Sequence, residues 1–166
     1  SLELGIDYSN QENSFEFGGS LSGLEATDEE KRLTGRGKLI IADTVGLLAE
    51  YGSGEREISY NFLLPSIKYD TTDATAELQL YAGKGFSIRL GANTSTEKEK
   101  DMPAGYKNET IETKSYIAPK FWFSEGFGIE LLAYSLKVEE NSVDATSDDT
   151  YSHTEGGGEV NLSFRF

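Results

Sequence analysis

The single histidine, His153, comes closest in this chain to a catalytic arrangement. His153 and Glu155 stand two positions apart, so in a strand they share a face and the carboxylate is placed to orient the imidazole. Ser152 points to the opposite face, so a serine nucleophile would have to come from another strand. An isolated surface histidine at the loop end of a strand is far commoner than a catalytic one. We therefore expect no enzymatic activity.

Other chemistries lack the residues that they usually need. The absence of cysteine excludes disulfides, thiolate metal sites and cysteine nucleophiles. Acidic residues gather at 97–101 and 139–149 without the regular spacing of a calcium loop. We interpret these stretches as solvated loops, with divalent-cation binding as the alternative. No phosphate-binding glycine loop or dinucleotide fingerprint occurs, and we expect no cofactor and no metal.

Composition narrows the class of protein. The chain has 29 acidic and 15 basic residues, a formal charge of −14, which argues against nucleic acid as a partner because phosphate binding needs a basic surface. Its 18 glycines, 9 tyrosines and 9 phenylalanines with only 3 prolines are a strand-and-turn composition. No apolar run approaches the roughly 18 residues of a membrane-spanning helix. Residues 1–166 are expected to form one domain, a mature or trimmed chain without a leader.

Period-two alternation runs through the chain and predicts an all-β fold of about ten strands, with eight and twelve as alternatives. Turns are expected at 10–13, 42–44, 53–57, 70–73, 83–85 and 124–126, and longer polar connections at 25–32, 94–108 and 139–150. Pro65 marks a bulge or a hidden turn. The strands expected from the alternation are 2–8, 15–21, 35–41, 45–51, 58–64, 76–82, 86–92, 117–123, 127–133 and 160–166.

The alternation separates a polar from an apolar face. Aromatic residues mark the ends of the apolar positions, as in the two interfacial belts of membrane proteins: Tyr8, Phe15, Tyr51, Tyr60, Phe86, Phe123, Phe127 and Phe166. Nearly every expected strand carries ionisable residues on its polar face: Glu3, Asp7, Glu16, Arg36, Lys38, Glu50, Glu77, Arg89, Lys120, Glu130, Glu159 and Arg165.

The last strand alternates strictly, with Val160, Leu162, Phe164 and Phe166 on one face. It resembles the closing strand of bacterial outer-membrane β-barrels, in which these residues are also the signal read by the barrel assembly machinery. The resemblance implies a transmembrane antiparallel up-and-down β-barrel in a Gram-negative outer membrane. Lipid and lipopolysaccharide would be its partners, and the oligomeric state is left open.

If the apolar face meets lipid, the ionisable residues on the polar face line the lumen, where charges must pair or be hydrated. Their mixed signs favour a lumen that is cross-linked by salt bridges over a single-sign selectivity filter. The leading functional hypothesis is therefore a porin-like or structural barrel that passes small solutes at most. Two alternatives remain: a surface adhesion or interaction barrel that acts through its acidic loops, and a soluble lipocalin-like barrel that binds a ligand on an inward-facing apolar surface.

Overall fold

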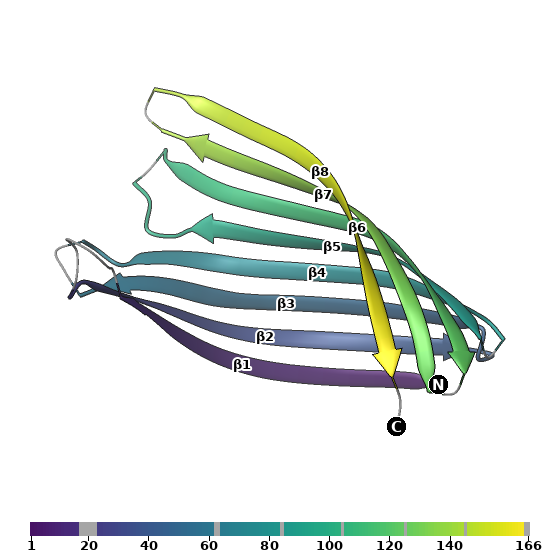
Figure 1. The fold of residues 1–166 in the computed structure, drawn as a ribbon. Helices are drawn as coiled ribbons and strands as arrows, with labels where there is room; N and C mark the ends of the chain where they lie inside the picture. The colour runs from purple at the N-terminus through teal and green to yellow at the C-terminus, as the bar shows by residue number, and fades with distance from the viewer. Residues whose placement is uncertain are drawn as a thin grey trace.

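Eight long antiparallel strands form one sheet in the computed structural model, in the order β1-β2-β3-β4-β5-β6-β7-β8. The structure describes residues 1–16, 23–61, 64–83, 85–103, 105–124, 126–144 and 146–164, and these contain no helix. Each strand pairs with its neighbour in sequence (Figure 1). The strands are β1 (Leu2–Glu16), β2 (Glu25–Ile41), β3 (Val45–Tyr60), β4 (Ile67–Ala82), β5 (Phe86–Glu99), β6 (Lys107–Ser124), β7 (Phe127–Val143) and β8 (Asp148–Phe164).

The all-β prediction is confirmed, but the prediction of ten strands is wrong. The chain does not turn at 10–13 or 53–57, because these polar residues continue β1 and β3 and pair with their neighbours. Likewise 25–32 and 70–73 belong to β2 and β4, and the expected loops at 94–108 and 139–150 are mostly strand. Loss of apolar alternation in these segments marks a change in the surroundings of the strand and not its end. In the expected strands 15–21 and 58–64, residues 17–21 and 62–63 lie outside the described residues.

The three shortest connections, between β2 and β3, β4 and β5, and β6 and β7, lie at one end of the sheet. The predicted turns at 42–44, 83–85 and 124–126 are confirmed, and Ala42, Asp43 and Gly83 adopt positive φ there. In Figure 1 the start of β1 and the end of β8 lie at this same end. The β3–β4 connection that contains Pro65 lies at the other end, so Pro65 belongs to a turn. We refer to the two ends as the turn end and the loop end.

The sheet curls but does not close. β1 pairs only with β2 and β8 only with β7, and no contact joins β1 to β8. The apolar side chains of these edge strands are therefore more exposed than their equivalents inside the sheet: Leu4 is 79% exposed, while Leu47 on β3 is 44% exposed. The closed barrel expected from the sequence is present only as an open, curled sheet.

The two faces differ in composition and in curvature. On the polar face, side chains reach over an intervening strand to a partner beyond it, as Arg89 on β5 does to Glu130 on β7. The buried residues, Ala118 and Glu77 among them, also lie on this face, which indicates that the sheet curls toward it. Several large polar-face side chains also lie over glycines of the adjacent strand, where an added Cβ would clash: Tyr116 over Gly91, Trp122 over Gly128 and Tyr134 over Gly157.

The sheet has almost no hydrophobic core. Among the described residues only Ala26, Ala118 and Val138 are buried apolar residues, and all three lie on the polar face. The accessible surface of 11006 Å² exceeds the about 8,100 Å² expected for a compact soluble protein of this mass. In the part of the chain that the structure describes, no helix is long and apolar enough to cross a membrane.

Candidate functional site: an ion-paired polar face behind an uncharged apolar band

One band of the apolar face carries no charged side chain. The band comprises the apolar-face positions of residues 2–8, 33–41, 45–53, 72–82, 86–96, 111–123, 127–135 and 154–164, one segment from each strand. None of these positions is Asp, Glu, Lys, Arg or His. Most segments are about nine to eleven residues long, which at about 3.4 Å per residue and a tilt near 40° spans about 25 Å. We call this surface the apolar band.

The loop-side border of the apolar band is abrupt. The next cross-strand row on this face is fully charged from β2 to β6, because the register aligns Lys31, Glu55, Asp70, Lys98 and Glu109. Beyond this row the same face of β1 to β6 stays polar, with residues such as Glu12, Glu29 and Glu57. The strands therefore extend past the band toward the loop end.

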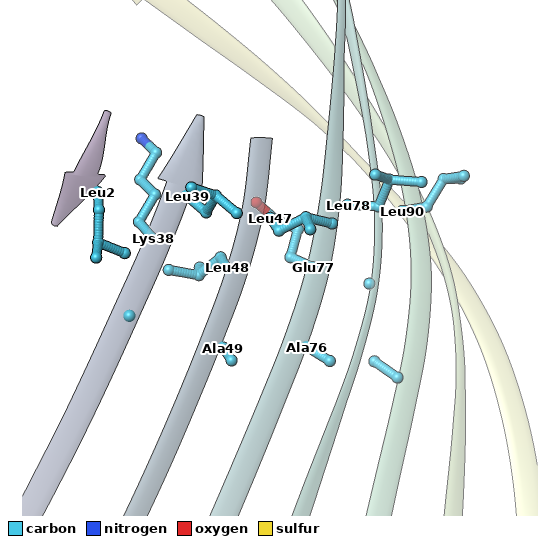
Figure 2. Close-up of a pocket in the computed structure, with 13 residues that line it drawn as sticks. Leu2, Lys38, Leu39, Leu47, Leu48, Ala49, Ala76, Glu77, Leu78 and Leu90 are labelled. Carbon is cyan, nitrogen blue, oxygen red and sulfur yellow. The ribbon is translucent and has the colours of Figure 1, made fainter. Parts of the chain in front are cut away.

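Register also aligns leucines in one row of the band. Leu2, Leu39, Leu47, Leu78 and Leu90 occupy one row across β1 to β5. The neighbouring row is small, with Gly37, Ala49, Ala76 and Ala92, so a shallow apolar hollow of about 600 Å³ forms beside the leucines (Figure 2). These leucines and alanines present an apolar surface that no other part of the described chain covers.

Aromatic side chains mark the turn-side border of the band. Phe86 contacts Phe121, with ring centroids 5.0 Å apart, and Phe127 contacts both Phe123 and Phe164 at 5.8 and 5.3 Å. Tyr8 and Tyr51 lie nearer the charged border. Phe15 and Tyr60, which we expected on the apolar face, lie on the polar face because β1 and β3 continue without a break.

The polar face opposite the band holds a network centred on Glu77. Its side chain is only 3% exposed and accepts hydrogen bonds from Tyr116 and Gln79. Arg89 lies between two carboxylates, 3.2 Å from Glu77 and 2.8 Å from Glu130. The network thus joins β4, β5, β6 and β7, and each charge in it has a partner of opposite sign or a hydrogen-bonding group.

A polar hollow of about 400 Å³ adjoins this network toward the turn end. Lys120 donates a hydrogen bond to the Ser163 hydroxyl at 3.0 Å and lies 4.7 Å from the ring centroid of Trp122. Tyr81 donates to Gln79, which in turn donates to Glu77. The hollow is lined by Gln79, Tyr81, Ser87, Arg89, Lys120, Trp122 and Glu130. Its lining can hold water or a small polar solute.

The residues predicted to share the polar face mostly do so. Glu3, Asp7, Arg36, Lys38, Glu50, Glu77, Arg89, Lys120, Glu130 and Glu159 all lie on it. Asp7 and Arg36 form an ion pair, Glu3 is opposite Lys38, and Glu50 is opposite Arg36. Glu16 lies on the apolar face, because β1 is continuous and every second residue from Leu2 to Glu16 points to the same side. Arg165, like Phe166 of the predicted assembly signal, lies outside the described residues, whereas Val160, Leu162 and Phe164 lie together on the apolar face of β8.

Beyond the band, ion pairs fix the loop-side half of the strands. Arg56 donates to Asp28 on β2 at 2.8 Å and to Glu97 on β5 at 2.7 Å. Hydrogen bonding to Asp28, and then to Glu97, raises the pKa of Arg56 above its usual value. Lys100 bridges Asp70 and Glu55, and these hydrogen bonds raise the pKa of Lys100. This half of the sheet is therefore held by polar contacts on both faces.

His153 lies opposite Val138 in the β7–β8 register. Its ring lies 5.9 Å from that of Tyr151 on the exposed edge strand β8. The described residues contain no group of three or more His, Cys, Asp or Glu side chains that is placed to hold a metal ion. The sequence did not single out Tyr116, Gln79 or Trp122, because neutral side chains carry no charge pattern. Their only sequence signal is a large polar or aromatic residue at a polar-face position.

Comparison with known proteins gives no match to a family model, to a curated protein or to a solved structure.

Proposed function

We propose that this chain is an integral β-barrel of a Gram-negative outer membrane, with its apolar band in lipid and its polar face turned to the lumen. One observation carries the proposal. Charges are excluded from a band of about 25 Å on one face, while the opposite face of the same segments is charged and paired. A water-soluble sheet has no reason to confine its charges in this way, because both exposed faces meet the same solvent.

The exposed apolar area supports the same conclusion. Most leucines, isoleucines and phenylalanines of the band are 37% to 79% exposed, and the others are half-buried. Soluble monomers rarely expose contiguous apolar patches larger than a few hundred Å². A lipocalin-like barrel would bury this face inside, but the sheet curls toward the polar face instead. Lipid is the cover that fits a continuous, uncharged and laterally uniform band.

The lumen of such a barrel is closed or narrow. Pairing of Arg89 with Glu77 and Glu130, and of Asp7 with Arg36, cross-links the polar face at the level of the band. We therefore favour a structural barrel that passes small solutes at most over an open porin. Outer-membrane lipid and lipopolysaccharide would contact the band, and the assembly machinery would read the β8 residues Val160, Leu162 and Phe164.

A second candidate, surface interaction, is favoured by the part of the sheet beyond the band. The strands continue there as an ion-paired polar sheet held by Arg56 and Lys100. Such an extension would stand outside the membrane on the loop side. It would present strands, in addition to loops, to a partner.

The proposal is tested by charging the band at two depths on one strand. Leu78 lies in the central leucine row of β4, and Thr72 lies on the same face at the charged border. In vesicles, Leu78→Arg should destabilise the folded protein by about 2–4 kcal/mol, while Thr72→Arg should cost about 0–1 kcal/mol. Urea unfolding of vesicle-bound protein measures both, and flotation with the vesicles reports insertion. Equal effects of the two substitutions, or a folded protein that needs neither lipid nor detergent, would contradict the proposal.

A further inference from the structure

The free edges of β1 and β8 are the surfaces that the structure leaves unpaired, and their register defines how they fit together. The cross-strand row that begins at Leu2 passes through the leucines of β2 to β5. It then continues through Ile117 on β6 and Ala133 on β7 to Gly158 on β8. In a closed barrel the row does not return to Leu2, because tilted strands must meet with a stagger. The stagger of the barrel is therefore the number of residues along β1 between Leu2 and the residue that lies opposite Gly158.

Two conditions limit this stagger. It must be an even number of residues, since an odd shift would turn the apolar residues of one strand to the polar face. It must also give the strand tilt of about 35–45° that barrels show. For eight strands with the usual spacings, staggers of six, eight, ten and twelve residues give tilts of about 28°, 35°, 41° and 47°. Only eight and ten remain.

Side-chain matching separates the two remaining values. With a stagger of eight, Leu4, Ile6 and Tyr8 lie opposite Phe164, Leu162 and Val160, so the exposed apolar residues of both edges cover one another. On the polar face, Asn161 then lies opposite Asp7. With a stagger of ten, Val160 lies opposite Asn10, and Leu4 loses a described apolar partner.

We propose that β1 and β8 of one chain pair with each other at a stagger of eight residues, Ile6 opposite Leu162, and so close the sheet. This inference rests on the proposed membrane function, because lipid supplies the force that turns the apolar band outward. Each edge is the partner of the other. A second copy of the chain or a foreign strand is therefore excluded from both edges.

Paired cysteines test the register, since the chain has no cysteine of its own. Ser14→Cys on β1 is combined in turn with Ser152→Cys, Thr154→Cys or Gly156→Cys on β8, which report staggers of six, eight and ten. All four positions are exposed on the same face. The pair Ser14→Cys with Thr27→Cys, neighbours in the β1–β2 register, is the positive control. Folded protein in vesicles is oxidised with copper phenanthroline and run on non-reducing gels.

We expect an intramolecular disulfide to form at least tenfold faster with Thr154→Cys than with the other two β8 positions. Faster reaction with Ser152→Cys or Gly156→Cys would overturn the register. Disulfide-linked dimers would show that a second copy occupies the edges. If only the control pair reacts, the edges stay apart. Each variant is also tested for flotation with the vesicles. A protein that does not float would contradict the proposed function, whereas a protein that floats but forms none of the expected disulfides would contradict only the pairing of β1 with β8.

Discussion

At the scale of single residues, we expect closure of the proposed lumen to depend on Arg89. It lies between Glu77 and Glu130, and Glu77 is nearly buried. A guanidinium held between two carboxylates is stable because all three groups are hydrogen-bonded in a confined space. Removing the arginine leaves two like charges, which separate and take up water.

We expect Arg89→Ala to convert a non-conducting barrel into a conducting one. Planar bilayers with the unaltered protein should show no discrete steps, whereas Arg89→Ala should show small steps with a preference for cations, since Glu77 and Glu130 remain. Lys137→Ala, which removes a positive charge from an exposed pair with Glu139, is the matched control and should stay silent. Steps of equal size in all three proteins would refute the role of Arg89.

At the scale of elements, alternation in the sequence was sufficient to predict strands, three turns and the shared face of most charged residues. It failed where strands became polar on both sides, as at 10–13 and 53–57. Nothing in a local window distinguishes such an extension from a loop. The pairing partner supplies the difference: Glu55, for example, continues β3 because it lies between Lys31 and Asp70 in the register. The predicted face of Glu16 is wrong for the same reason, because a turn was expected at 10–13 where β1 continues.

The β7–β8 connection depends on one carboxylate. Asp144 accepts hydrogen bonds from the backbone N–H groups of Thr146 and Ser147 at 2.7 and 2.8 Å and from the Thr146 hydroxyl at 2.9 Å. These bonds favour the charged form and lower the pKa of Asp144. These bonds therefore order the loop fully at pH values above the ordinary pKa of aspartate. Their effect is lost as the pH falls through the lowered pKa of Asp144.

We expect Asp144→Ala to speed amide exchange at Ser147 severalfold at neutral pH, because the N–H group loses its acceptor. The unaltered loop should reach the same exchange rate, after correction for intrinsic exchange, only in acid below about pH 4. Asp149→Ala, which removes an equal charge from exposed β8, should leave Ser147 protected. Hydrogen exchange followed by NMR measures all three. A loop that stays protected in Asp144→Ala would show that other contacts hold it.

At the scale of the whole molecule, the sheet lacks the feature that makes a soluble protein stable. Its described residues bury three apolar side chains and expose a band of leucines and phenylalanines. Opposite the band, its charged groups are paired on the polar face. We expect the same arrangement to become stable once lipid covers the band and the β1 and β8 edges meet. We therefore infer that, within the band, the apolar face of each strand contacts lipid and the polar face does not.

Spin labels along β4 test that claim most directly. Single cysteines at each position from 74 to 82 would carry a nitroxide in the vesicle-bound protein, and collisions with oxygen and with an aqueous nickel chelate would be measured by EPR. We expect a period of two, with high oxygen accessibility at Ala74, Ala76, Leu78, Leu80 and Ala82 and low oxygen accessibility at Thr75, Glu77, Gln79 and Tyr81. Nickel accessibility should be low at the even positions. The opposite phase, or equal nickel accessibility on both faces, would contradict the account.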